Sequence, residues 1–190
     1  MKQICVFGSS SEIIDRVYLD TAEELGKFLV HKGCGVVYGA GKYGVMGAVS
    51  RGARAAGGEL TGVSPTFFNE LDVLTRDYGK LIFTESMRER KAVMEDLADA
   101  FIICPGGIGT LEEFFEVITL KQLGRHNKPI IILNTLGFYD PMIDMLDRFV
   151  TQNFISENVH KLYSIASDID EVWEQLENYT PFGYNKYDIK

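Results

Sequence analysis

Short apolar runs of four or five residues alternate along the chain with longer stretches whose apolar residues recur at helical spacing. The short runs are continuous rather than alternating, which is typical of strands buried on both faces of a sheet. The predicted strands are residues 3–7, 35–38, 59–63, 80–83, 100–104, 129–133 and 162–165. The predicted helices are residues 12–32, 45–56, 86–97, 111–123, 140–152 and 168–178. This alternation predicts an α/β fold, a doubly wound parallel sheet with helices on both faces.

The length of 190 residues favours a single domain with one sizeable core. We expect this domain to span residues 1–180, because no linker or repeat interrupts the alternation of elements. Residues 181–190 read as an irregular C-terminal tail.

Three of the predicted strand-to-helix turns are rich in small residues. They follow the first, second and fifth strands as Gly8-Ser9-Ser10-Ser11, Gly39-Ala40-Gly41-Lys42-Tyr43-Gly44 and Pro105-Gly106-Gly107-Ile108-Gly109-Thr110. If all strands are parallel, the three turns meet at the edge of the sheet where ligands bind. Glycines let a ligand approach the backbone, and the first amides of a helix attract an anion. The third turn therefore predicts a phosphate site.

Charge and composition restrict the partners of the protein. A net charge of −8 argues against a nucleic-acid or anionic membrane surface, so we expect neither partner. Cys5, Cys34 and Cys104 lie in apolar segments without a CxxC pair and read as buried, reduced residues. With no signal-peptide pattern at the start of the sequence, a cytoplasmic location is expected.

The histidines show no pattern of a metal or catalytic centre. His31, His126 and His160 are far apart, have no metal-ligand spacing, and are expected at the surface. We therefore predict no metal site.

The second turn matches the GxGxxG spacing of dinucleotide-binding proteins, but that match alone is weak. The fingerprint also requires an acidic residue at the end of the next strand. Here Glu59 begins that strand, so an NAD-dependent oxidoreductase is disfavoured.

Two predicted helices carry the charged residues that suit ligand binding or catalysis. Met87, Arg90 and Lys91 share one face of the helix that starts near Ser86, and Arg90 has the fork geometry that suits a phosphate or ribose oxygen. In the helix after Thr110, three glutamates lie on one arc: Glu112, Glu113 and Glu116. Acids at a helix start are often only solvated and favoured by the dipole. Carboxylates beside an anion site are costly unless they act in chemistry or bind sugar hydroxyls.

Together these segments resemble the LOG-type phosphoribohydrolases (cytokinin riboside 5′-monophosphate phosphoribohydrolases), a family formerly described as possible lysine decarboxylases. The family motif PGGxGTxxE stands here as residues 105–113, and its MxxRK element as residues 87–91. The segments at 6–10, 37–41 and 44–47 are also similar. Two positions differ from common members, namely Ala40 in the second turn and Leu120, where plant members often carry tryptophan.

The resemblance implies a Rossmann-like homodimer that cleaves the N-glycosidic bond of a nucleoside 5′-monophosphate. The substrate would be AMP or an N6-substituted (cytokinin) AMP, and the products a free base and ribose 5-phosphate, without a cofactor. It assigns Arg90 and Glu113 as the catalytic pair. The residues it assigns to substrate binding are Gly8, Ser9, Gly39, Gly41, Gly44, Met87, Lys91, Gly106, Gly107, Gly109, Thr110, Glu112 and Thr119.

One further reading remains open at this point, and another is disfavoured. A non-catalytic nucleotide or molybdenum-cofactor carrier on the same fold is the alternative, and the presence of both Arg90 and Glu113 favours the enzyme. A lysine decarboxylase is disfavoured, because it would need a Schiff-base lysine with a pyridinium partner. Only Lys91 lies near the predicted site, and nothing marks a pyridinium partner. For the homodimer, the apolar residues of helix 111–123 give mild support, because Val117 and Leu120 widen its apolar arc.

Overall fold

The computed structural model describes residues 1–69 and 71–182 of the chain. Its strands are β1 (Gln3–Phe7), β2 (Gly35–Tyr38), β3 (Leu60–Pro65), β4 (Lys80–Thr84), β5 (Ala100–Ile103), β6 (Ile130–Leu133) and β7 (Ser164–Ala166). They form one seven-stranded sheet in the order β4-β3-β2-β1-β5-β6-β7, and every neighbouring pair is parallel. The predicted doubly wound parallel sheet is confirmed.

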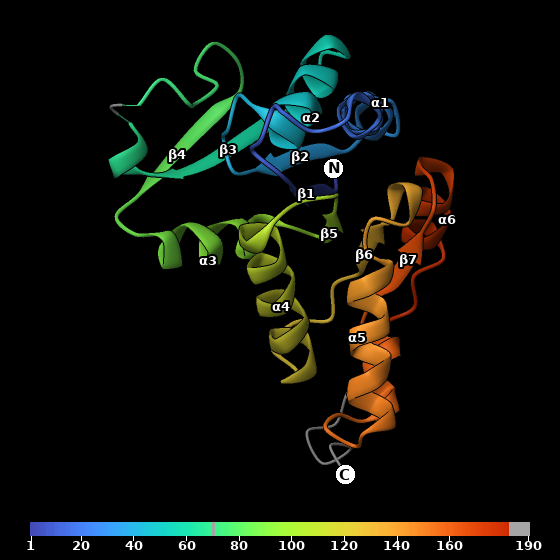
Figure 1. Ribbon diagram of the computed structural model, residues 1–190. Helices are drawn as coiled ribbons and strands as arrows, with labels where there is room; N and C mark the ends of the chain where they lie inside the picture. The colour runs from blue at the N-terminus through green and yellow to red at the C-terminus, as the bar shows by residue number, and fades with distance from the viewer. Residues whose placement is uncertain (70, 183–190) are drawn as a thin grey trace.

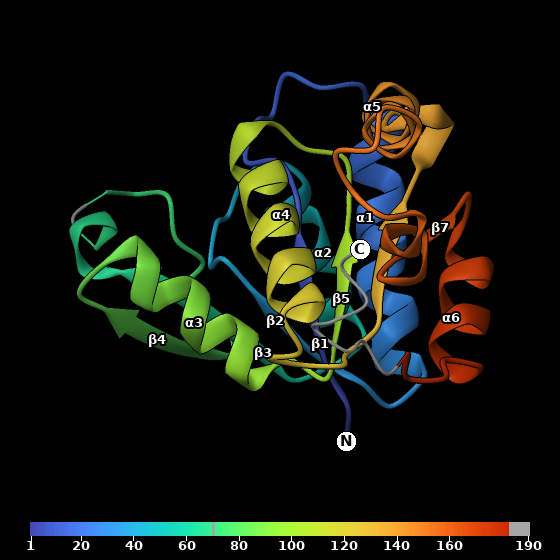
Figure 2. The same cartoon turned by 90° about the horizontal axis from the view of Figure 1, so that it is seen from below.

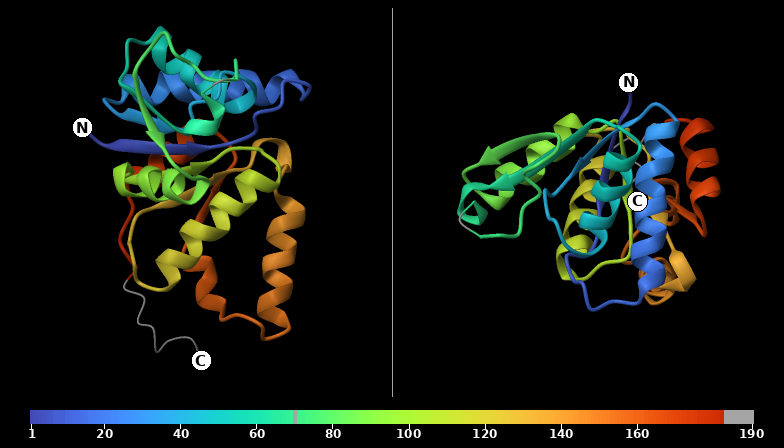
Figure 3. Two further views of the ribbon diagram at one scale, coloured as in Figure 1. Left: turned by 90° about the vertical axis from the view of Figure 1, so that its left-hand side faces the viewer. Right: turned by 90° about the horizontal axis from the view of Figure 1, so that it is seen from above.

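Helices cover both faces of this sheet (Figure 1). The helices are α1 (Arg16–His31), α2 (Gly44–Ala55), α3 (Met87–Leu97), α4 (Ile108–Gln122), α5 (Asp140–Thr151) and α6 (Ile169–Glu177). Apolar residues of α1, α2 and α6 pack on one face, and those of α3, α4 and α5 pack on the other. The view from below (Figure 2) places the second group in front of the sheet, and the view from above (Figure 3, right) shows the first group.

Side chains of the central strands alternate between the two cores, as the two-residue period of a strand requires. On β1, Ile4 and Val6 belong to the core under α1 and α2, whereas Cys5 and Phe7 face α3 and α4. Both sets are essentially inaccessible to water. Continuous apolar runs are therefore explained by burial on both faces.

The seven strands and six helices are found where the sequence predicts them, with shifts at their ends. The largest shift is in α1, which begins at Arg16 with Asp15 as N-cap rather than at residue 12. Three short 3-10 helices were not predicted: Thr66–Phe68, Thr135–Gly137 and Glu157–Lys161. Such single turns lack the periodicity by which longer helices are recognised. Of the predicted tail, residues 183–190 lie outside the described part.

The strand order fixes where a ligand site can form. Successive strands run outward from β1 to β4, and the chain then returns to place β5 on the other side of β1. The reversal lies between β1 and β5, whose register pairs Phe7 with Ile103. In open α/β sheets ligands bind outside the carboxyl ends of the strands at such a switch point. The turns beginning at Gly8 and Pro105 follow these two strands.

Candidate active site

A cavity of about 610 Å³ lies at the carboxyl ends of the central strands. Its size is in the range of small-molecule sites. The three glycine-containing turns converge on it, as the sequence predicts. Its lining consists of Gly8, Ser9, Ser10, Ser11, Gly39, Gly41, Tyr43, Met46, Phe68, Val73, Leu74, Met87, Arg90, Gly107, Ile108, Gly109, Thr110 and Glu113.

Backbone hydrogen bonds tie the first turn to its neighbours. The amide of Ser9 donates to the carbonyl oxygen of Pro105 at 3.2 Å, and the Ser9 carbonyl accepts from the Met46 amide at 3.3 Å. Gly44 begins α2 with a φ of 60°, and a Cβ there would lie 2.5 Å from the Ser9 carbonyl oxygen. Only glycine fits both the dihedral and the space. Gly44 therefore holds the cavity wall together without lining it.

The start of α4 forms the polar end of the cavity. The N-cap is Gly107, which has no side chain to accept bonds from the first amides of the helix. A Cβ on Gly107 or Gly109 would meet no protein atom within 4 Å, so both positions open onto the cavity. A Cβ on Gly106, in contrast, would lie 2.1 Å from Oγ1 of the buried Thr110. The amides and the helix dipole make this end a site for an anion such as phosphate.

Arg90 and Glu113 form a buried ion pair in the cavity wall. Arg90 Nη1 donates to Glu113 Oε1 at 2.8 Å, and the two side chains are 8% and 11% exposed. Arg90 Nε donates to the carbonyl oxygen of Val63 at 3.1 Å, so β3 fixes the plane of the guanidinium. Burial raises the pKa of Glu113, and the charge and hydrogen bond of Arg90 oppose that rise. Glu113 is therefore not part of a solvated acidic face, although the first turn of a helix often carries one.

The other two glutamates of α4 have a different partner. Lys91 forms ion pairs with Glu112 and with Glu116, the latter at 2.5 Å, and its side chain is 12% exposed. Burial lowers the pKa of Lys91, but its hydrogen bonds to Glu112 and Glu116 raise it above the ordinary value overall. Lys91 thus links α3 to α4 as a charged ammonium group beside the cavity wall.

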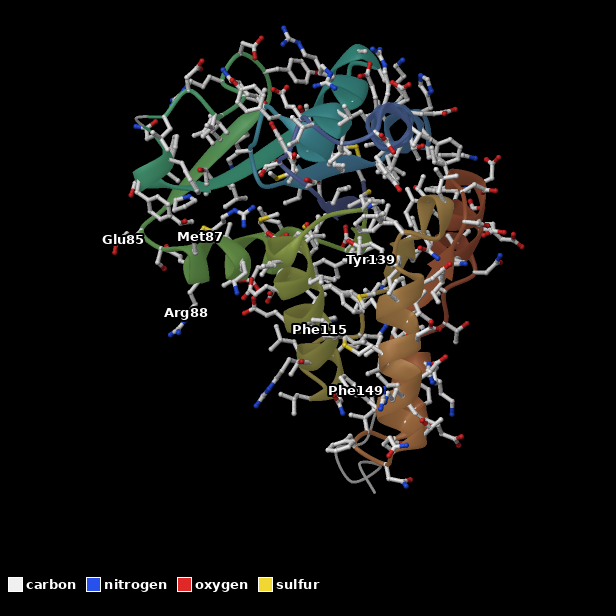
Figure 4. All side chains as sticks on the ribbon, in the orientation of Figure 1. Glu85, Met87, Arg88, Phe115, Tyr139 and Phe149 are labelled. Carbon is white, nitrogen blue, oxygen red and sulfur yellow. The ribbon has the colours of Figure 1, made fainter. Side chains whose placement is uncertain are left out.

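The opposite end of the cavity is apolar. Met46 and Met87 come from α2 and α3, while Phe68, Val73 and Leu74 come from the segment between β3 and β4. Figure 4 shows Met87 on the side of α3 that faces the sheet, whereas Arg88 extends away from the molecule. A planar ring with an apolar substituent suits such a surface.

Ten of the fifteen predicted site residues line the cavity: Gly8, Ser9, Gly39, Gly41, Met87, Arg90, Gly107, Gly109, Thr110 and Glu113. Gly44 and Gly106 support the turns, and Lys91 and Glu112 pair with each other. Thr119 is exposed on α4, about 16 Å along the helix from its first residue at 1.5 Å per residue. The structure does not bring Thr119 to the cavity of its own chain.

Several lining residues escaped the sequence analysis. Tyr43 and Met46 flank Gly44, so their proximity to a recognised turn was the available signal. Phe68, Val73 and Leu74 lie in a segment that carries no motif. Its position after β3, at the ligand-binding edge of the sheet, was the only indication.

Among the cysteines and histidines, one expectation is corrected. All three cysteines are buried and free, as predicted. His31 and His160 are exposed, but His126 is half-buried and its Nε2 donates to the Val117 carbonyl oxygen at 2.8 Å. Its Nδ1 accepts from the Lys128 amide at 3.2 Å, so the neutral ring closes the loop after α4.

Comparison of the sequence with known proteins agrees with the PGGxGTxxE turn and the buried Arg–Glu pair, because it finds the same family. The model of the family described as possible lysine decarboxylase, which contains the LOG proteins, matches residues 46–176. The cytokinin riboside 5′-monophosphate phosphoribohydrolase LOG of Oryza sativa subsp. japonica is 42% identical over 180 residues, 95% of this chain and 74% of the relative. The chain belongs to the LOG family. A second LOG family member, LOG5 of Arabidopsis thaliana, is 38% identical and covers 95% of this chain and 79% of its own.

Solved structures agree on the fold. The molybdenum cofactor binding protein of Rippkaea orientalis superposes with a TM-score of 0.71 at 24% identity, covering 93% of this chain and 95% of that one. The molybdenum cofactor carrier protein of Chlamydomonas reinhardtii gives 0.70 at 23% identity, covering 94% and 99%. The LOG family fold is therefore shared with proteins of other names. Within residues 1–69 and 71–182, no helix has the length and apolar character needed to cross a membrane.

Proposed function

We propose that the protein hydrolyses the N-glycosidic bond of a nucleoside 5′-monophosphate, either AMP or an N6-substituted AMP, to free base and ribose 5-phosphate. The observation that carries this proposal is the buried Arg90–Glu113 pair in the wall of a cavity whose polar end is the start of α4. The names of the LOG relatives support the same activity. The cavity has the two ends that a nucleotide requires, one for a phosphate and one for a base.

In this proposal the substrate lies along the cavity. Its 5′-phosphate accepts hydrogen bonds from the amides at Gly107, Gly109 and Thr110 at the start of α4. The base lies against the apolar end, near Met46 and Met87. The ribose then passes Glu113, and the turns at Gly8 and Gly39 border the nucleotide.

Glu113 acts on the developing charge of the reaction. Breaking the bond between C1′ and the base nitrogen leaves the electron pair on the base and oxocarbenium character on the ribose. A carboxylate beside C1′ stabilises that charge and orients the attacking water. The water oxygen bonds to C1′, and its proton balances the negative charge on the departing base.

Arg90 has a supporting role in this scheme. A guanidinium is a poor proton donor, but it opposes the rise that burial causes in the pKa of Glu113 and holds Oε1 in place. The carbonyl of Val63 prevents the guanidinium from rotating. Both contacts require the fork of arginine.

Decarboxylation of lysine does not fit the same residues. A Schiff-base lysine must lose its proton to react, whereas Glu112 and Glu116 raise the pKa of Lys91 and hold its ammonium group. Lys91 is also absent from the cavity lining among the described residues.

The proposal extends to a cytoplasmic homodimer. Reduced cysteines fit the cytoplasm, and all three here are free. For the dimer, Val117 does not contribute as expected, because it is buried in the core of its own protomer. At the C-terminal end of α4, the C-cap residue Leu123 is still 53% exposed, and Leu120 is half-buried one turn before it. In a dimer that covers this end of α4, Thr119 lies at the interface.

The test is incubation of purified protein with AMP and, separately, with N6-isopentenyl-AMP, followed by chromatography of the free base. Release of base from either nucleotide supports the proposal, and the ratio of rates identifies the preferred base. No release, with nucleotide still bound, would replace it by a carrier function like that of the molybdenum cofactor carrier protein of Chlamydomonas reinhardtii, which shares the fold.

A further inference from the structure

A second cavity, of about 240 Å³, lies next to the segment between β3 and β4 that also lines the first cavity. It is formed between α2 and residues 74–78, which lie close together in Figures 1 and 3. Its lining consists of Lys42, Ser50, Arg51, Arg54, Leu60, Leu74, Thr75, Asp77 and Tyr78. None of the predicted substrate-binding residues belongs to it.

The charge of this lining is opposite to that of the whole chain. The lining contains three cations, Lys42, Arg51 and Arg54, and one carboxylate, Asp77, although the net charge of the protein is −8. Arg51 and Arg54 are three residues apart on α2 and therefore project from neighbouring positions of one face. Two guanidinium forks and an ammonium group that line one hollow match the oxygens of a phosphate.

The carboxylates that now pair with these cations are weakly held. Arg54 binds Asp77, whose side chain is 67% exposed, and Lys42 binds Asp72 at 2.6 Å, whose side chain is 91% exposed. Arg51 binds Glu23 of α1 at 3.2 Å, and these two side chains are 51% and 37% exposed. Exposed pairs of this kind contribute little. A dianion has twice the charge of a carboxylate and can replace it at the arginine fork.

Other contacts keep the arginine side of the cavity in place without Asp77. The Arg54 guanidinium lies 5.4 Å from the centre of the Tyr78 ring, and the Tyr78 hydroxyl donates to the Gly58 carbonyl oxygen at 2.7 Å. Ser50 Oγ is buried and donates to the Gly47 carbonyl oxygen at 2.9 Å. We propose that this cavity is a second binding site, for a small ligand carrying a phosphate dianion.

The same segment connects this site to the first cavity. Leu74 lines both cavities, and Lys42 stands between Gly41 and Tyr43, which line the first one. The Lys42 amide donates to the Val73 carbonyl oxygen and the Thr75 amide to the Ala40 carbonyl oxygen, both at 2.9 Å. A ligand that takes Lys42 from Asp72 therefore acts on the apolar end of the first cavity, and this part of the inference rests on the proposed function.

The experiment is a titration of the full-length, ¹⁵N-labelled protein with inorganic phosphate, read at the backbone amides of residues 50–54 and 74–78. These amides report the second site separately from residues 107–110, so the result does not depend on the hydrolase activity. Arg54→Gln and Asp77→Asn form a matched pair, because each removes one charge from the same ion pair. We expect about fivefold weaker phosphate binding for Arg54→Gln and about fivefold tighter binding for Asp77→Asn, since one charge is removed from each side.

The control is Arg16→Gln on α1, which removes one exposed cation that pairs with Asp20 and should leave the affinity unchanged. Opposite effects of the matched pair support the site. Changes in the same direction would show only a loosened segment, and unmoved amides at 50–54 would exclude phosphate there; either result overturns the inference. A parallel titration with ribose 5-phosphate identifies the source of the dianion: a lower Kd than for inorganic phosphate at the same amides indicates a sugar phosphate.

The link between the cavities has its own readout. Phosphate competes with AMP for the first cavity and so should raise the KM for AMP in both proteins. The rise should be larger in wild-type protein than in Arg54→Gln, whose second site binds phosphate more weakly. Without phosphate, Arg54→Gln should keep its kcat within about twofold of wild type. An equal rise in KM for the two proteins would contradict the link while leaving the binding result intact.

Discussion

Replacing Gly39 by alanine should disable the Arg90–Glu113 pair without touching either residue. A Cβ on Gly39 would lie 2.0 Å from Arg90 Nη2 and 2.9 Å from Met46 Sδ. Ordinary contact begins near 3.4 Å, so the guanidinium must move by about 1.4 Å. It has little freedom to do so, because Nε is bound to Val63 at 3.1 Å and Nη1 to Glu113 at 2.8 Å.

The magnitude follows from these bonds. A displacement of about 1 Å in a catalytic constellation reduces the rate by about 100-fold, and a lost hydrogen bond to a charged group is worth about 1.5–3 kcal/mol. We therefore expect the kcat of Gly39→Ala to fall by about 100-fold. The KM should change much less, because the amides at the start of α4 are not displaced.

Steady-state kinetics with the preferred nucleotide, together with thermal unfolding of each variant, tests this expectation. The matched control is Gly35→Ala at the other end of β2, where the three atoms nearest to the new Cβ all belong to the flexible side-chain amide of Gln3. Gly35→Ala should retain the wild-type kcat. A kcat of Gly39→Ala within twofold of wild type would refute the claim that Arg90 keeps its position because residue 39 has no side chain.

Three further substitutions test other parts of the site. Arg90→Gln removes the charge that opposes the raised pKa of Glu113, so the acid limb of the kcat/KM profile should move to higher pH. An acid limb that does not move in the pH–rate profile would show that Arg90 has no effect on the ionisation of Glu113. Lys91→Gln leaves two carboxylates unpaired and should lower the free energy of unfolding, measured in urea titrations, by about 1 kcal/mol. Its kcat should stay within about threefold of wild type, and a large loss of kcat would show that Lys91 contacts the substrate. Tyr139→Phe removes the hydroxyl that donates to the Cys104 carbonyl oxygen at 2.8 Å and should lower the same free energy by about 1 kcal/mol; unchanged stability would contradict this role for the hydroxyl.

The sequence predicted the sheet and the meeting of the three turns because these depend on local signals. Strands buried on both faces need continuous apolar runs such as that before Pro105, and the parallel arrangement brings the turns after them to one edge. The pairing of Arg90 with Glu113 was implied by the family resemblance only. Their contact depends on how α3 and α4 pack on the sheet, which no local pattern encodes.

The segment between β3 and β4 was the least predictable part of the site. It contains no motif, yet it supplies Phe68, Val73 and Leu74 to the cavity. Its position is set by backbone bonds to the second glycine turn, including Lys42 to Val73 and Thr75 to Ala40. Such long-range bonds between two loops leave no periodic trace in the sequence. Likewise, the ion pairs of Lys91 with Glu112 and Glu116 were not visible in the sequence, and the assignment of Lys91 to substrate binding rests on the family resemblance alone.

The central claim is that Glu113 performs the chemistry of glycosidic bond cleavage. The most direct test is Glu113→Gln, which keeps the size of the side chain and removes its charge. Base release from AMP or N6-isopentenyl-AMP and nucleotide binding by calorimetry should be measured on the same preparation. The account predicts that release of base is abolished while the Kd for the nucleotide stays within a few-fold of wild type. A variant that keeps most of its rate would contradict it.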